Sequence, residues 1–477
     1  MCQRTNASAR IAEEGSASCR RIRIVASVGW GLVLVFVLWA ALLGSVAANA
    51  RAFQLAYFVG FAGYLAVLWA VCRRASDEGG SHQAAVAPCG RWGWWLAACL
   101  IVRLVPLAME PGDDVYRYAW EGRVQLAGFS PFVSAPNDPT LVKLRDSCWS
   151  KINHPDYPAI YPPVAQLEFL AVAAVDRFLN GGACHSVHLI KILHTLWDLM
   201  VVVLLGACLR RSGRPPHGAV VYGLCPLVLT AFAIEGHVDS LMLLFAALAS
   251  WAVLAKRSAL AGAALGLAVA TKLVFVVLAP WFVKRHPRAV IASIVVLILS
   301  YLPYAHVGPA MFTGLLRFGA SGEFFSLPGT LGIAYYDTHL GHVVGVALLG
   351  TIVIVLSFRR REWFDYAHGA VGALLLLIPI VHYWYVSWVL VLLPFRLRMR
   401  WIVAALGMAS YFDAVHAQAL TSRWHMPAWA PTAVWIPFLL VWAVELVLEH
   451  YVNPRSGIPV SSPVAAERKS TAQAMRA

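Results

Sequence analysis

Long apolar runs, separated by shorter polar stretches, make up most of the chain. A helix needs about 20 apolar residues to cross a bilayer, and many of these runs approach or exceed that length. The apolar residues are continuous and do not alternate with polar ones, which argues against an outer-membrane barrel. The pattern predicts an all-α polytopic membrane protein with about 12–14 transmembrane helices. The expected helical segments are residues 24–47, 53–71, 94–108, 187–209, 218–233, 240–255, 259–283, 289–304, 340–358, 369–381, 385–395, 401–417 and 432–448.

Two apolar segments do not fit a simple crossing. Residues 162–180 contain acidic side chains such as Glu168, so we expect a helix that lies at the outer membrane surface. Residues 259–283 have basic residues at both ends and are interrupted by Lys272, so we expect a hairpin of two short helices. A lysine at the centre of a bilayer costs ~2.5–3.5 kcal/mol, and we therefore expect Lys272 to face a cavity.

The polar segments define the domain organisation. Residues 109–186 form the longest polar segment and are expected to be a first large extracytoplasmic loop, and residues 305–338 a second. Residues 1–23 and 451–477 are polar and are expected to be disordered tails. Residues 24–450 are then a single transmembrane domain, with the large loops carrying short helices near the membrane.

Charge placement predicts the orientation. Charged residues make up only 13% of the chain, against about 25% in soluble domains. Lysine and arginine gather in alternate short loops, and this bias places both termini in the cytoplasm and both large loops outside the plasma (inner) membrane. The net charge of +14 therefore reflects membrane topology, and we expect no nucleic acid partner.

The nine cysteines contain no CxxC pair, so the sequence gives no zinc or redox motif. Cys148 and Cys184 both fall in the first large loop. The outer compartment can be oxidising, but the sequence leaves open whether these two residues form a disulfide.

The first large loop begins with adjacent carboxylates, Asp113 and Asp114, which are the candidate catalytic residues. Consecutive residues on a helix point about 100° apart, so one of the two is expected to face a substrate as a general base. The alternative role for either is to cap the helix that follows, which is worth about 1 kcal/mol.

Other unusual polar and aromatic side chains fall on the same predicted side of the membrane, where ionisable groups at helix ends are functional by default. The candidates for binding the substrate or the donor phosphate are Arg117, Arg123, Lys272, His382, Tyr118, Glu121, His154, Tyr161, His237, Asp239 and Tyr385.

Each candidate also has a structural alternative. Arg117 follows Asp114 by three residues and can form an ion pair with it. The tyrosines and His382 can be membrane-interface residues, and Lys272 can extend to a surface. His237 and Asp239 are too few for a tight metal site, so no metal is expected.

Nucleotide-binding and serine-hydrolase motifs are missing from the sequence, since it has no GxGxxG after a strand, no Walker loop and no GxSxG. An enzyme that acts outside the cell must receive an activated donor already attached to a lipid. We therefore expect no cofactor, with the lipid-linked sugar as co-substrate.

Several segments resemble one known family. The loop sequence DDVYRYAWEGRVQLAGFSPFVSAPNDPTLVKLRD, followed by INHPDYPAIYPPVAQ, is similar to the first outer loop of bacterial polyprenol-phosphate-mannose-dependent mannosyltransferases of the GT-C superfamily. GHVDSLMLLFAAL, LAGAALGLAVATKL and HYWYVSWVLVLLP resemble later segments in the same order, so the similarity covers residues 113–394.

The resemblance implies an inverting transfer from a polyprenyl-phosphate sugar, without a nucleotide, and a catalytic carboxylate in the first outer loop. A D-x-x-R-Y spacing, found in related aminoarabinose transferases, fits Asp114, Arg117 and Tyr118 and favours Asp114 as the base. Many relatives read W-D-G-R where this chain has Glu121 in the second position, a difference that keeps the charge.

The hypothesis is an integral-membrane glycosyltransferase that moves a hexose to an acceptor hydroxyl on the outer face. Mannose is favoured by the resemblance alone, and the acceptor can be a glycan, a lipid or a protein. Arg117 or Arg123, with Lys272 or His382, would stabilise the leaving phosphate. A lipid or sugar transporter (flippase) is the alternative, because it would explain Lys272 in a divided helix. A non-catalytic scaffold is a further alternative, and it predicts that substituting both aspartates is harmless.

Overall fold

The computed structural model describes residues 2–78, 92–182, 184–320, 322–333, 339–421 and 426–452. These residues form helices and connecting segments, and the only strand-like pairing among them is one isolated bridge between Phe324 and Ile380. The prediction of an all-α polytopic membrane protein is confirmed.

The longer α-helices are α1 (Cys2–Leu43), α2 (Ala50–Glu78), α3 (Trp92–Leu104), α4 (Asp113–Leu126), α5 (Pro163–Phe178), α6 (His185–Arg211), α9 (Asp239–Leu254), α10 (Ser258–Thr271), α12 (Pro287–Tyr301), α15 (His339–Arg359), α16 (Trp363–Leu377), α19 (Tyr411–Thr421) and α20 (Trp429–Val452). The shorter helices are η1 (Val105–Ala108), η2 (Pro139–Leu144), η3 (Trp149–Lys151), η4 (Pro216–Ala219), α7 (Val220–Gly223), α8 (Pro226–Leu229), η5 (Thr230–Ile234), η6 (Leu273–Leu278), α11 (Ala279–Arg285), η7 (Leu302–Phe312), α13 (Thr313–Gly319), α14 (Leu327–Thr330), η9 (Tyr383–Val386), α17 (Ser387–Leu390), α18 (Met399–Gly407) and η10 (Met408–Ser410).

Within the described residues, six helices are long and apolar enough to cross a membrane, or up to eight if two bent pairs each count as one span. This count is lower than the predicted 12–14. Two of the expected segments that fall short are α9 and α10, which are 16 and 14 residues long and largely buried among other helices. The expected segments 369–381, 385–395 and 401–417 also fall short, because no helix in them exceeds 15 residues. Apolar composition alone does not distinguish a helix covered by protein from one covered by lipid.

The irregular segments follow the predictions closely. A helix, α5, occupies residues 163–178 of the segment expected to lie at the outer membrane surface. The expected hairpin is divided at Lys272, where α10 ends, the backbone is extended and η6 begins. The ammonium of Lys272 lies against Asp239 and two aromatic rings, and 14% of its side chain is exposed.

The amino-terminal segment differs from its prediction. Residues 1–23 were expected to be disordered, but from Cys2 onward they continue α1 as one helix. Their alanine, arginine and glutamate residues favour helix formation, and this local preference outweighs the low hydrophobicity. The predicted carboxy-terminal tail lies outside the described residues from position 453 onward.

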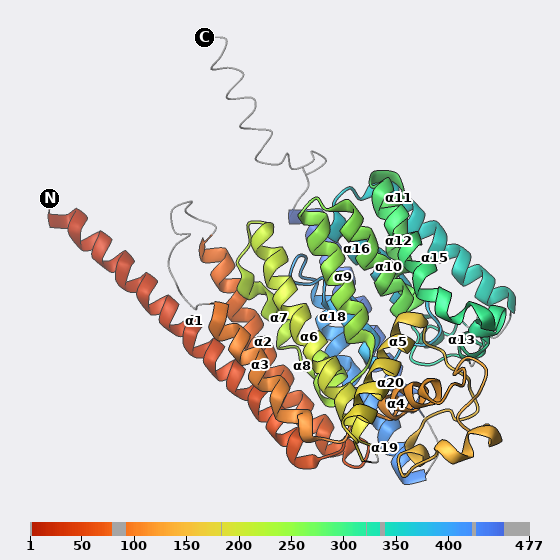
Figure 1. The fold of residues 1–477 in the computed structure, drawn as a ribbon. Coiled ribbons are helices and arrows are strands. Elements are labelled where there is room, and N and C mark those ends of the chain that lie inside the picture. Colours follow the sequence, from red (N-terminus) through yellow and green to blue (C-terminus); the bar gives the residue numbers. More distant parts are fainter. Residues whose placement is uncertain are drawn as a thin grey trace.

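The bundle has two chemically distinct ends. Helices α4, α5 and α13 lie at one end, and α11 and the start of α1 lie at the other (Figure 1). We call the first the site face and the second the basic face. The basic face carries cationic residues at the ends of α6 and α11 and in the turn between α9 and α10, namely Arg210, Arg211, Lys256, Arg257, Lys284 and Arg285.

On the site face, a disulfide between Cys148 and Cys184 joins the first large loop to the start of α6, with Cα atoms 5.7 Å apart. A second connection comes from α13, where Arg317 donates to the carbonyl of Asp156 and lies over the ring of Tyr157. These contacts hold the first large loop against the bundle.

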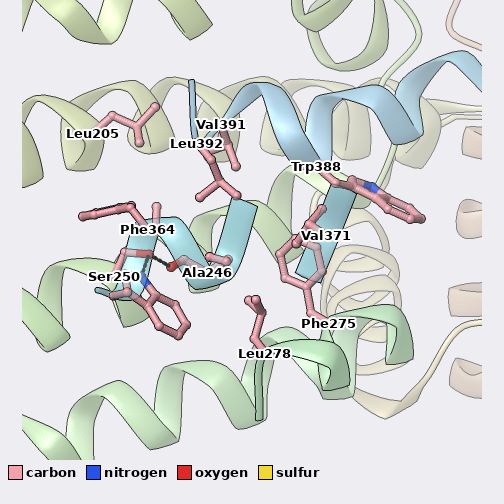
Figure 2. Close-up of a pocket in the computed structure, with 13 residues that line it drawn as sticks. Leu205, Ala246, Ser250, Phe275, Leu278, Phe364, Val371, Trp388, Val391 and Leu392 are labelled. Atoms are coloured by element: carbon pink, nitrogen blue, oxygen red, sulfur yellow. Dashed lines mark hydrogen bonds between the residues drawn. The ribbon is translucent and has the colours of Figure 1, made fainter. Parts of the chain in front are cut away.

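A small apolar pocket, with a cavity volume of about 20 Å³, lies between α6, α9, α16 and the segment that begins with Trp388 (Figure 2). Ser250 is a polar residue in its wall, and its hydroxyl donates to Ala246 and accepts from the indole of Trp363. The lining therefore suits hydrocarbon and offers little to a sugar. The polar chemistry is concentrated at the site face.

Candidate active site

Asp113 and Asp114 occupy the first turn of α4, and the capping position before them belongs to Gly112. Neither aspartate is therefore the helix cap that the sequence left as an alternative. Their negative charges still interact favourably with the amino-terminal end of the helix dipole. Because the capping position is taken by glycine, both carboxylates are available for other contacts.

Asp114 is the centre of a hydrogen-bond network. Its Oδ1 accepts from Nδ2 of Asn153 at 2.6 Å, and its Oδ2 accepts from the hydroxyl groups of Tyr118 at 3.3 Å and Tyr161 at 3.5 Å. Nδ1 of His237 lies 3.2 Å from the same Oδ2. The first large loop, α4 and the turn before α9 thus meet at one carboxylate, of which 15% is exposed.

The two adjacent carboxylates differ in their electrostatics. Burial disfavours the charge on Asp114, but the hydrogen bond and charge of His237, together with Asn153, hold its pKa well below the usual value. Surrounding protein atoms and the charge of Asp114 raise the pKa of Asp113 to about 7. Solvent nevertheless reaches the Asp113 side chain. Asp114 is therefore the stronger acid of the pair and is ionised at neutral pH, whereas Asp113 gains its charge near neutral pH.

A third carboxylate, Glu235, lies behind this pair. Its backbone carbonyl accepts from the amide of Gly112, and a Cβ added to Gly112 would meet its Oε2 at 2.6 Å. Burial and the charge of Asp113 raise the pKa of Glu235 to about 8. Gly112 leaves room for the Glu235 carboxylate where the start of α4 contacts the turn before α9.

Stacked rings extend the network toward the aromatic turn HYWY at residues 382–385. The imidazole of His237 stacks on Trp384 with ring centroids 3.7 Å apart, and His382 stacks on Trp384 at 4.4 Å. Nε2 of His237 lies 3.3 Å from the hydroxyl of Tyr383, and Nδ1 of His382 lies 2.8 Å from the hydroxyl of Tyr411. Burial lowers the pKa of His382 to about 3, so its ring is neutral at neutral pH.

A buried ion pair adjoins the network. Nζ of Lys272 lies 2.8 and 3.1 Å from the two oxygens of Asp239, two residues after His237. The indole of Trp388 donates to the same carboxylate at 2.6 Å, and the ammonium lies 4.3 Å from the centre of the Tyr385 ring. The predicted residues Lys272, Asp239 and Tyr385 are thus brought together.

Four predicted residues have contacts outside the Asp114 network, namely Arg117, Glu121, Arg123 and His154. The guanidinium of Arg117 pairs with Glu121 at 2.6 Å and donates to the carbonyls of His154 and Tyr157. Arg117 therefore does not form the ion pair with Asp114 that the sequence left open. Its donors are used to support the loop, and phosphate binding by Arg117 stays a prediction.

Arg123 also braces the first large loop, through Asp146 at 2.7 Å and the carbonyl of Leu144. Glu121 accepts from Gln166 of α5 in addition to Arg117, so it joins α4 to α5. These contacts favour a supporting role for both residues over direct contact with a substrate.

Sequence reasoning missed two partners of the network. Asn153 lies in a proline-rich stretch of the first large loop, and Tyr411 lies in the expected helical segment at residues 401–417. Neither position has a spacing that signals its role. Both are identified only by the groups they contact, Asp114 and His382.

The sequence was compared with families of known proteins. The model of the family described as alpha-(1->6)-mannopyranosyltransferase, N-terminal domain, matches residues 17–286, more than half of the chain. The chain belongs to this family. It is therefore a mannosyltransferase-family membrane protein, as the resemblance implied. A search of curated proteins found no match, and a search of solved structures found none.

The matched range includes Asp113, Asp114, His237, Asp239 and Lys272, and it ends before the HYWY turn. Across the described ranges, no group of three or more histidine, cysteine, aspartate or glutamate side chains is arranged to hold a metal ion. The site is instead a carboxylate surrounded by hydrogen-bond donors, stacked rings and one lysine.

Proposed function

We propose that this protein transfers mannose from a polyprenyl-phosphate donor to an acceptor hydroxyl, with Asp114 as general base. The observation that supports this function best is the convergence on Asp114 of donors from the first large loop and from the turn before α9. An ionised carboxylate that is held in one position can accept the proton of a hydroxyl group as that group attacks.

In the proposed reaction, the acceptor oxygen forms a bond to the anomeric carbon while the bond from that carbon to the phosphate oxygen breaks. The acceptor proton passes to Oδ2 or Oδ1 of Asp114, and the electron pair of the broken bond leaves with the polyprenyl phosphate. Attack from the face opposite the phosphate inverts the configuration. General-base assistance contributes roughly 10²- to 10⁴-fold to the rate.

Lys272 is the proposed partner of the leaving phosphate. Its ammonium already lies beside Asp239 and the Tyr385 ring, and both arginines of α4 are occupied by loop contacts. A cation placed where negative charge grows stabilises the transition state. His382 has a neutral ring, so it would contribute a hydrogen bond and no charge.

The proposal places the site face outside the plasma membrane and both termini in the cytoplasm. Two features support this orientation. The disulfide of Cys148 and Cys184 lies on the site face, and disulfides form in oxidising compartments. The clustered arginines and lysines lie on the basic face, as expected for cytoplasmic loops.

The test is a reconstitution experiment. Purified protein in proteoliposomes would receive polyprenyl-phosphate [¹⁴C]mannose and a cell-envelope glycan or lipid extract, and products would be analysed by mass spectrometry. The proposal predicts a new mannosidic bond and release of polyprenyl phosphate. Movement of unchanged donor across the bilayer, without product, would instead support a flippase. Product formation with both aspartates replaced by asparagine would exclude the proposed base.

A further inference from the structure

A second carboxylate–histidine pair lies directly behind the proposed active site. His194 of α6 is fully buried, and its Nε2 lies 3.1 Å from Oε2 of Glu168 on α5. Its Nδ1 lies 2.7 Å from the carbonyl oxygen of Gly236. The other carboxylate oxygen of Glu168 accepts from the indole of Trp197 at 2.6 Å. Nothing in the proposed reaction uses this pair.

The hydrogen-bond partners fix where the protons of this pair lie. A carbonyl oxygen can only accept, so Nδ1 of His194 must carry a proton and donate it to Gly236. The facing nitrogen meets a carboxylate, so a second proton lies between Nε2 and Glu168. The contact with Glu168 therefore sets the orientation of the ring and keeps its donor directed at Gly236.

Gly236 is a sensitive point for the site because His237 follows it. Its φ of +76° lies in the left-handed region, and an added Cβ would meet Val115 of α4 at 3.1 Å. The amide of His237 donates to the carbonyl of Ala231. With its carbonyl held by His194, the peptide group between residues 236 and 237 cannot rotate without breaking a buried hydrogen bond.

His194 also contacts the other side of the network. Its ring lies edge-on to Tyr118 with centroids 5.8 Å apart, and the hydroxyl of Tyr118 donates to Asp114. One buried side chain thus touches both the turn that presents His237 and a tyrosine that contacts the same carboxylate.

We propose that His194, oriented by Glu168, is a positioning residue that holds the Gly236 carbonyl and thereby directs the His237 ring at Asp114. This inference rests on the proposed function, in which Asp114 is the base. It gives α5 a part in the reaction, because that helix supplies the carboxylate that orients His194. Loss of a supporting partner of this kind lowers activity by roughly 10- to 100-fold.

Two substitutions of His194 separate its two hydrogen bonds. In His194→Asn, the amide nitrogen takes the place of Nδ1 and can still donate to Gly236. In His194→Gln, the amide reaches toward Glu168 and the donor to Gly236 is lost. We expect His194→Gln to lower kcat roughly 10- to 100-fold with KM changed less than about threefold. We expect His194→Asn to recover kcat to within about threefold of the unsubstituted protein.

Trp197→Phe is the matched control. It removes a hydrogen bond to Glu168 on the side away from Gly236, and we expect kcat within about threefold of the starting value. The His237→Ala background supplies the decisive readout. If His194 acts through His237, adding His194→Gln to His237→Ala lowers kcat little further, because the two effects are not additive.

The outcomes distinguish this inference from the proposed function. Full additivity of the two substitutions, or equal losses in His194→Gln and His194→Asn, would overturn the positioning role while leaving Asp114 as base. Full activity of Asp114→Asn would overturn the proposed function itself. Should His194→Gln fail to accumulate in membranes, Glu168→Gln tests the same pair, with an expected loss of kcat that also disappears in the His237→Ala background.

Discussion

Replacing Asp114 by asparagine is the sharpest test of the proposed chemistry. The amide keeps the shape of the side chain but cannot take up the acceptor proton. Because His237 and Asn153 keep Asp114 ionised in the unsubstituted protein, the whole contribution of the base is lost. A loss of roughly 10²- to 10⁴-fold in kcat corresponds to about 2.7–5.5 kcal/mol in the activation free energy.

Stability is expected to change much less than activity. The amide oxygen can still accept from Asn153, and the amide nitrogen can donate to the hydroxyl of Tyr118 or Tyr161. These bonds become weaker because the charge is gone, but a buried charge no longer has to be desolvated. We therefore expect the substituted protein to reach the membrane and to elute from size-exclusion chromatography in detergent as the unsubstituted protein does.

The assay is transfer from polyprenyl-phosphate [¹⁴C]mannose in proteoliposomes, with kcat and KM measured separately. Asp138→Asn is the matched control, because Asp138 is an exposed carboxylate of the same loop that accepts from Thr140. Asparagine caps a helix about as well as aspartate, so the control should change kcat less than about threefold. More than about a third of normal kcat in Asp114→Asn would refute the assignment of the base. A comparable loss in Asp113→Asn alone would move that role to Asp113.

Three further predictions concern the surroundings of this carboxylate. Surrounding protein atoms and the charge of Asp114 raise the pKa of Asp113 to about 7, so Asp113 becomes charged as the pH rises through 7, and this charge makes Asp114 a stronger base. We therefore expect kcat/KM to increase through about pH 7. The pH profile of Asp113→Asn should lack that increase. Lys272→Met leaves the buried charge of Asp239 without its cation and should lower the unfolding free energy by about 3–5 kcal/mol. The double variant Lys272→Met with Asp239→Asn should recover most of this stability, as measured by thermal unfolding. Cys148→Ser removes the disulfide to Cys184, which closes a loop with a sequence separation of 36 residues, and should lower the unfolding free energy by about 4 kcal/mol. An unchanged Tm would contradict this expectation.

Several features could be predicted from local sequence. The hydropathy of a segment indicates whether it favours an apolar or an aqueous environment. Composition along the chain therefore predicts the class of protein, most helical segments and the break at Lys272. The helix α5 follows from its apolar pattern, and the acidic residues that interrupt this pattern predict that it does not cross the membrane. The site carboxylates were identified because adjacent aspartates directly after an apolar span are uncommon and costly without a role.

Among the described residues, fewer helices are long and apolar enough to cross a membrane than the 12–14 that the sequence predicts. Residues in α9 and α10 are as apolar as residues that face lipid, but they are covered by other helices. Local hydrophobicity has the same value in both environments. The structure adds the length of each helix, and α9 and α10, at 16 and 14 residues, are shorter than the roughly 20 residues that a crossing requires.

The sequence by itself determined that this is a helical membrane protein with a carboxylate pair at the start of a polar loop. Tertiary structure alone decided the partners of those carboxylates: Asn153 and His237 for Asp114, Glu121 for Arg117, and Glu168 for His194. The physical reason is that hydrophobicity and charge act on each segment separately, whereas a hydrogen bond requires two atoms within about 3 Å of each other. That proximity is set by how α4, α5, α6 and the turn before α9 pack together.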